Sequence, residues 1–137
     1  MIDIKTTIPH REPFLFVDSV IDIGERTIVA GKTFSPTEYF YGGHYPSNPI
    51  TPGVILCETV FQTAAILVLK NFPEAAGVPV LAKIEEARFR SIVKPGEALK
   101  ITAELEEKYG KFFLMNGSIH RTDGTSVLRI KFSLAVN

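Results

Sequence analysis

The chain has 137 residues, of which 45% are hydrophobic and 22% are charged, so we expect one globular domain over residues 1–137. Fifteen basic and fifteen acidic side chains cancel, which argues against a nucleic-acid-binding protein and against a basic membrane-surface protein. One cysteine excludes an internal disulfide, and the first residues lack the basic start and apolar run of a signal peptide. We therefore expect a cytoplasmic protein.

The first part of the chain predicts a β-hairpin. Residues 14–23 and 27–34 are rich in β-branched and aromatic residues, and Gly24 and Glu25 lie between them as a turn. Residues 35–41 then lead to His44, which we expect on a stiff loop, because Pro46, Pro49 and Pro52 fix the backbone at every third position.

Residues 54–69 predict a helix. Only four of these sixteen residues are polar, so the helix is apolar nearly all round and should be buried. A membrane span is the weaker alternative, because sixteen residues extend about 24 Å against a bilayer core of about 30 Å, and the helix contains an ionisable group. Gly53 precedes the helix, where backbone N–H groups without helical partners point at negative charge, as in an oxyanion hole.

Glu58 and Gln62 form one polar stripe on this helix, because residues four apart share a face. Burial raises the pKa of a carboxyl group, which would make Glu58 a proton donor near neutral pH. The alternative is that Glu58 bonds to Gln62 or to a backbone group and only holds the helix in register.

Four further strands follow the helix. They are predicted at residues 80–90, 99–105, 111–121 and 128–136, with a turn at Asp123 and Gly124. The pattern indicates an α+β protein in which an antiparallel sheet of about six strands covers one long central helix.

Residues 43–62 follow a known pattern. They read Gly43-His44-Tyr45-Pro46, then Pro49, then Pro52-Gly53-Val54, then Glu58 and Gln62. This pattern resembles the 3-hydroxyacyl-[acyl carrier protein] dehydratases of type II fatty acid synthesis, the FabZ/FabA-type enzymes. Residues 8–18 and 87–97 also resemble this family. The resemblance departs from the family pattern at a few positions, which suggests a specialised relative: Gly42, Tyr45, Thr51, Thr59, Phe61, Ser91 and Ile92.

The resemblance implies a hot-dog fold, with the sheet wrapped around the helix, and a homodimer, in some members a trimer of dimers. It implies that acyl carrier protein bearing a 3-hydroxyacyl phosphopantetheine is the partner, and that no cofactor is needed. It also implies that Tyr45, Pro52 and Val54 bind substrate, and that His44 of one chain faces Glu58 of the other. The residues themselves leave pairing within one chain open.

Dehydration of a 3-hydroxyacyl thioester needs a base, an oxyanion site and an acid. His44 can act as the base, the Gly53 N–H can hold the thioester oxygen, and Glu58 can protonate the departing hydroxyl, with Gln62 orienting Glu58. Two alternatives are a hot-dog thioesterase, in which the carboxylate activates water, and a non-catalytic subunit that binds acyl carrier protein.

Other candidate residues have weaker signals. Cys57 is expected in the core rather than as a nucleophile. His10 is interpreted as structural or as an entrance contact, and the spacing of His10, His44 and His120 predicts no metal site. Arg88 and Arg90 share one face of a strand, where they either receive an acidic carrier protein or are simply solvated.

Overall fold

The computed structural model describes residues 2–75 and 77–136. The helices are α1 (Ile4–Thr7), α2 (Tyr39–His44) and α3 (Gly53–Asn71). The strands form one antiparallel sheet in the order β1-β2-β4-β5-β6-β3, and their bounds are β1 (Ser19–Ile23), β2 (Thr27–Thr33), β3 (Pro79–Phe89), β4 (Ala98–Tyr109), β5 (Phe112–Arg121) and β6 (Ser126–Val136).

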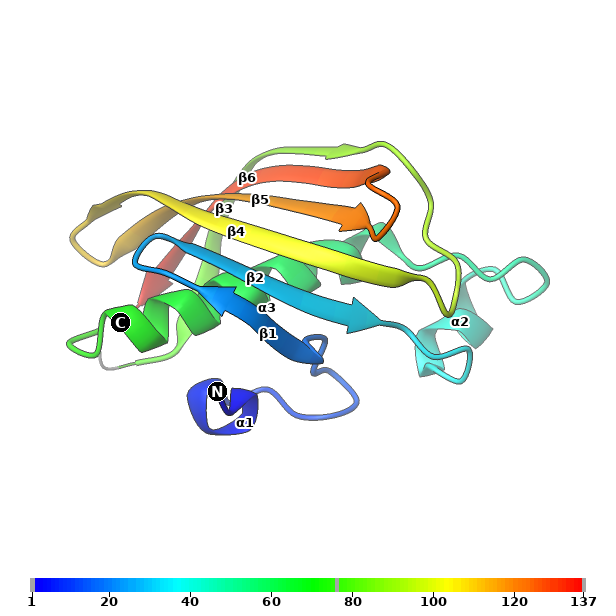
Figure 1. The fold of residues 1–137 in the computed structure, drawn as a ribbon, viewed down its shortest axis with the longest axis horizontal. Helices are drawn as coiled ribbons and strands as arrows, with labels where there is room; N and C mark the ends of the chain where they lie inside the picture. The colour runs from blue at the N-terminus through cyan, green and yellow to red at the C-terminus, as the bar shows by residue number, and fades with distance from the viewer. Residues whose placement is uncertain (1, 76, 137) are drawn as a thin grey trace.

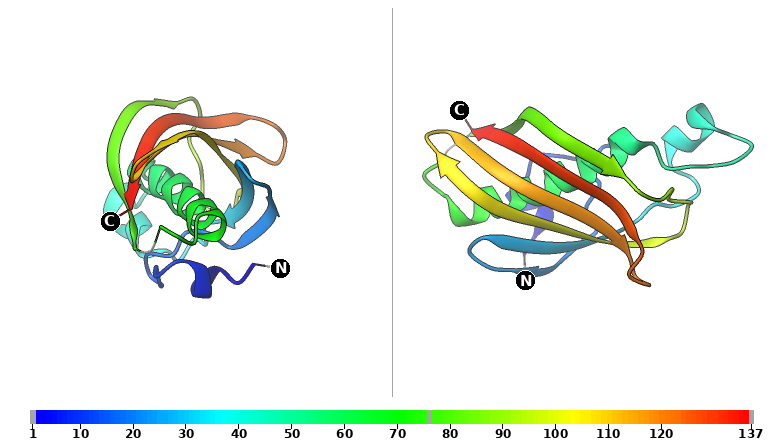
Figure 2. Two further views of the ribbon diagram at one scale, coloured as in Figure 1. Left: turned by 90° about the vertical axis from the view of Figure 1, so that its left-hand side faces the viewer. Right: turned by 90° about the horizontal axis from the view of Figure 1, so that it is seen from above.

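The sheet curls around α3, as the end-on view in Figure 2 shows, and the same wrapping is visible from the side in Figure 1. This is the hot-dog arrangement, so the predicted fold class is confirmed. The turn between β1 and β2, the long helix and the four later strands lie where the sequence patterns predict them, within about four residues at each end.

Helix α3 is buried over most of its length because the sheet covers it. It is long and apolar enough to span a membrane, yet 72% of the relevant stretch is buried inside the protein. Its two threonines need no outside partner, because the hydroxyl of Thr59 donates to the carbonyl of Ile55 and that of Thr63 to the carbonyl of Thr59. A packed core therefore accounts for the hydropathy of this helix.

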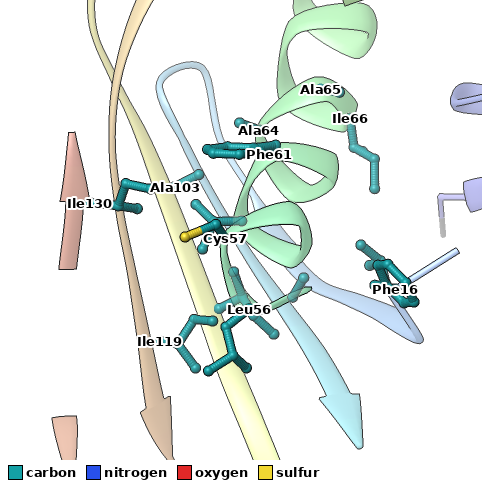
Figure 3. Packing of buried hydrophobic residues seen from close by; sticks show 14 of the residues in the cluster. Phe16, Leu56, Cys57, Phe61, Ala64, Ala65, Ile66, Ala103, Ile119 and Ile130 are labelled. Atoms are coloured by element: carbon teal, nitrogen blue, oxygen red, sulfur yellow. The ribbon is translucent and has the colours of Figure 1, made fainter. Parts of the chain in front are cut away.

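The core lies between α3 and the inner face of the sheet (Figure 3). Strand β5 shows the expected alternation, with Phe113, Met115 and Ile119 fully buried. Cys57 lies on the side of α3 that faces the sheet, and burial raises the pKa of its thiol, so it is a core residue as predicted.

Two predictions about the first part of the chain were wrong. Strand β1 begins at Ser19 rather than at residue 14, because the backbone before it bonds to a side chain of α3 instead of to a neighbouring strand. His44 is the last residue of the short helix α2, rather than part of the proline-rich loop, which begins one residue later.

Gly117 marks the closest approach of the sheet to the helix. A Cβ atom at this position would lie 2.3 Å from Cγ1 of Val60 on α3 and 3.3 Å from Cγ2 of Ile130 on β6. No side chain fits in that space without a shift of the helix or the sheet.

We expect Gly117→Ala to lower the free energy of unfolding by about 1–3 kcal/mol, because the added methyl group overpacks the contact with Val60. Urea unfolding followed by circular dichroism measures the loss. Gly42→Ala is the matched control, since a Cβ there meets nothing within 4 Å. Val60→Ala in the Gly117→Ala background should recover part of the stability, and equal losses at Gly117 and Gly42 would contradict this account.

Candidate active site

His44 is held by the loop that follows it. Its Nδ1 lies 2.9 Å from the carbonyl oxygen of Ile50, and its ring packs edge-on against Tyr45 with 4.5 Å between the centroids. A carbonyl oxygen only accepts hydrogen bonds, so Nδ1 carries the ring proton when the imidazole is neutral. Nε2 is then left with its lone pair, which is the form a general base needs.

The loop between α2 and α3 is anchored at Thr51. The hydroxyls of Thr51 and Tyr41 lie 2.6 Å apart, and the Thr51 N–H donates to the carbonyl of Val93 over 2.8 Å. Both side chains are buried. The hydroxyl at this position, where the resemblance leads one to expect an apolar residue, therefore ties the loop to α2, while the backbone N–H ties it to the segment between β3 and β4.

Helix α3 begins with unpaired backbone donors. The carbonyl of Pro52 accepts from the N–H groups of Ile55 and Leu56, while no residue in the described parts of the chain accepts from the N–H of Gly53 or Val54. These donors stand at the positive end of the helix dipole, as an oxyanion site requires.

Two of the three residues predicted to bind substrate, Pro52 and Val54, lie at this helix start. Pro52 is buried, whereas Tyr45 and Val54 are 57% and 76% exposed. Phe89, at the end of β3, packs against Gly53, where a Cβ would lie 3.0 Å from its ring. The start of α3 is thus an exposed apolar surface beside the end of an edge strand.

Gln62 makes three hydrogen bonds that fix its amide. Its Oε1 accepts from the N–H of Phe16 over 2.8 Å, and its Nε2 donates to the carbonyl of Phe14 over 2.8 Å and to Oε2 of Glu58 over 2.9 Å. Each atom has the partner that its chemistry demands, so the amide has one orientation. The predicted contact between Glu58 and Gln62 is therefore present, and it extends to the segment before β1.

Glu58 is partly buried, with 24% of its side chain exposed. Burial raises the pKa of its carboxyl group above the ordinary value of 4.5, and the hydrogen bond from Gln62 and the charge of His10 counteract part of that rise. The predicted bond to Gln62 is thus present, and burial shifts the pKa of the carboxyl group in the direction that a proton donor needs.

One chain does not bring His44 and Glu58 into contact. Among the described residues, the polar contacts of Glu58 are with Gln62 and His10, and His44 contacts Ile50 and Tyr45. Figure 1 shows α2 and the loop after it extending past the start of α3 at one end of the molecule. His44 and Glu58 are therefore held separately within the chain.

The sequence interpretation underestimated His10. Its Nε2 lies 3.7 Å from Oε2 of Glu58, although 48 residues separate the two along the chain, and no local pattern indicates such a contact. Arg88, in contrast, lies on the outer face of the sheet, where its Nε is 2.8 Å from Oε1 of Glu86. Arg88 and Arg90 both line a hollow of about 500 Å³ on that face.

Comparison with known families shows which family this chain resembles over most of its length. The model of the FabA-like domain matches residues 8–131, a range that contains His10, His44, Glu58 and Gln62. The chain belongs to the FabA-like family. The FabA-like match thus begins before β1 and ends within β6, so it takes in every strand of the sheet.

Two relatives cover most of the FabA-like chain. A 3-hydroxyacyl-[acyl-carrier-protein] dehydratase FabZ from Petrotoga mobilis is 40% identical over 115 residues, which are 84% of this chain and 82% of that protein. The enzyme of the same name from Thermotoga neapolitana is 38% identical over 134 residues, which are 97% of this chain and 94% of that protein.

Among solved structures, the dehydratase heterocomplex ApeI:P from Xenorhabdus doucetiae contains a chain with the same fold. That chain superposes on this one with a TM-score of 0.81 at 19% identity, covering 100% of this chain and 92% of the other. At this identity the likeness establishes the fold of the FabA-like chain and not its chemistry.

We expect Gln62→Leu to lower the free energy of unfolding by about 2–4 kcal/mol, because it leaves the N–H of Phe16 and the carbonyl of Phe14 without partners. Thr63→Val is the matched control on the same helix, since the Thr63 hydroxyl bonds only to a carbonyl of its own helix. Urea unfolding measures both changes. A loss for Gln62→Leu no larger than that for Thr63→Val would contradict the bridging role.

Proposed function

We propose that this protein removes water from a 3-hydroxyacyl thioester carried on acyl carrier protein and forms the trans-2-enoyl thioester, as a step of fatty acid biosynthesis or of a related polyketide-type pathway. The observation that carries the proposal is the Glu58 carboxyl group, whose pKa is raised by burial and which lies on the helix that begins with unpaired amides. The names of the relatives, which align over most of this chain, support the same reaction.

Each residue has one task in the proposed reaction. Nε2 of His44 takes the proton from C2 of the substrate, and the electron pair of that C–H bond moves toward the thioester carbonyl. The Gly53 N–H stabilises the negative charge on the carbonyl oxygen. Glu58 gives its proton to the 3-hydroxyl group, the electron pair returns from the carbonyl oxygen to form the C2=C3 double bond, the C3–O bond breaks, and water leaves. His44 has gained one proton and Glu58 has lost one, so the reaction needs no cofactor.

We propose that the active site is completed in a homodimer, so that His44 of one copy faces Glu58 of a second copy. The supporting feature is β3, an eleven-residue strand at the edge of the sheet that exposes four large apolar side chains. A long apolar edge strand invites pairing with another strand. The side chains in question are Val80, Leu81, Ile84 and Phe89.

The position of the edge strand links the dimer to the active site. Phe89 ends β3 and packs on Gly53, so a second copy paired along β3 would also cover the exposed start of α3. Three such dimers would make the trimer of dimers that the resemblance implies. We place the enzyme in the cytoplasm, in keeping with a single cysteine that is free and buried.

The direct test offers purified protein a panel of 3-hydroxyacyl-carrier thioesters and follows loss of water by mass spectrometry. We expect His44→Ala and Glu58→Gln each to lower kcat/KM by about 10²-fold or more, because each removes an acid or a base. His120→Gln, on β5, is the control and should leave the rate unchanged. Losses below about tenfold for both variants would refute the assigned roles.

The same assay separates dehydration from the two alternatives. Release of free thiol, detected with a thiol reagent, would identify a thioesterase instead. Binding of the acyl carrier without turnover, unaffected by Glu58→Gln, would identify a non-catalytic subunit.

Mixing two inactive variants tests whether the site is shared between copies. When His44→Ala and Glu58→Gln chains are unfolded together and refolded in equal amounts, half of the dimers contain both variants. In each mixed dimer one of the two shared sites is intact, so we expect about a quarter of the wild-type activity. Pairing within one chain predicts no recovery. Size-exclusion chromatography with light scattering verifies that dimers have formed.

A further inference from the structure

Oε2 of Glu58 faces two nitrogen atoms from different parts of the chain. Nε2 of Gln62 donates to it over 2.9 Å, and Nε2 of His10 lies 3.7 Å away, a distance in the range of an ion pair. Oε1 has no partner among residues 2–75 and 77–136. Oε2 accepts the hydrogen bond from Gln62, so in the neutral carboxyl group the proton lies on Oε1.

The surroundings of His10 indicate which ring nitrogen carries its proton. Nδ1 is buried, and no group in the described parts of the chain bonds to it. A buried N–H without an acceptor is unfavourable, so in the neutral ring the proton lies on Nε2, the atom that faces Glu58. Arg11 fixes the backbone here, because its guanidinium group donates to the carbonyls of His10, Ile8 and Lys5.

We propose that His10 is a positioning residue for the acid of the reaction: its Nε2–H and the Gln62 amide hold Oε2 of Glu58 as an acceptor, which leaves the transferable proton on Oε1. The inference rests on the proposed function of Glu58. When Oε1 gives its proton to the departing hydroxyl group, a carboxylate forms, and the two N–H donors stabilise the negative charge.

The electrostatics of the site agree with this geometry. Burial raises the pKa of Glu58, and His10 acts in the opposite direction. Among the described residues, the titratable group that acts on Glu58 is His10, from the segment before β1, while Glu58 itself raises the pKa of the thiol of Cys57, next to it on α3. In the proposed dimer, His44 of the second copy joins His10. Loss of His10 should therefore raise the pKa of Glu58 further.

The kinetic test compares His10→Leu with His10→Gln. Leucine removes the donor, so kcat should fall about five- to tenfold, while KM should change less than about twofold. In a plot of kcat against pH, the alkaline limb should move to higher pH. Glutamine supplies an N–H near the position of Nε2 and should restore kcat to within about threefold. His120→Gln is the control. Equal losses in both His10 variants, with the alkaline limb unmoved, would overturn the proposal.

A second measurement needs no turnover. Urea unfolding of wild type, His10→Leu, Glu58→Gln and the double variant at pH 8 forms a double-mutant cycle. We expect a smaller stability loss from His10→Leu when Glu58 is already replaced, and additive losses would overturn the proposal. If Glu58→Gln leaves turnover intact, the proposed function fails while the cycle still decides the role of His10. If Glu58→Gln abolishes turnover and the cycle is additive, only the role of His10 fails.

Discussion

The side-chain amide of Gln62 joins three parts of the molecule on which the proposed site depends. It bonds to Glu58 one turn earlier on α3, to the carbonyl of Phe14 and to the N–H of Phe16. The segment before β1 is thereby drawn onto the helix rather than into the sheet, and His10 comes to lie beside the carboxyl group. A buried amide with every donor and acceptor paired is rigid, so the acid is held in one place.

The sequence predicts the fold well because the hydrophobic patterns are strong. Alternation along β4, β5 and β6 indicates strands, and the apolar run of α3, interrupted by only a short polar stripe, indicates a buried helix. Helical spacing also predicts the contact between Glu58 and Gln62. These features depend on neighbours close in the chain, which periodicity can detect.

Features set by distant contacts escape such an analysis. The helical turn that ends at His44 is held by the Tyr41–Thr51 and His44–Ile50 bonds, which local propensity does not indicate. His10 reaches Glu58 only because the segment around it bonds to Gln62. Gly117 lies in an ordinary strand pattern. Only the packing of α3 against the sheet shows that this position has no room for a side chain.

The hot-dog fold alone says little about chemistry, because it is shared with a solved structure at 19% identity. What makes this chain a candidate dehydratase is the setting of two side chains. His44 bonds through Nδ1 and so leaves Nε2 free to accept a proton, and burial raises the pKa of Glu58. Since the two lie apart in one chain, the exposed edge of β3 is the feature that would bring them together.

The central claim is that Glu58 keeps its proton above the ordinary pKa of a glutamate. Carbon-13 NMR of protein labelled at glutamate side-chain carboxyls, with Glu58→Gln to assign the resonance, measures its titration directly. The account predicts a pKa above 4.5 in the folded protein. A midpoint at or below 4.5 would mean that burial does not raise the pKa of this carboxyl group and would contradict its role as the proton donor.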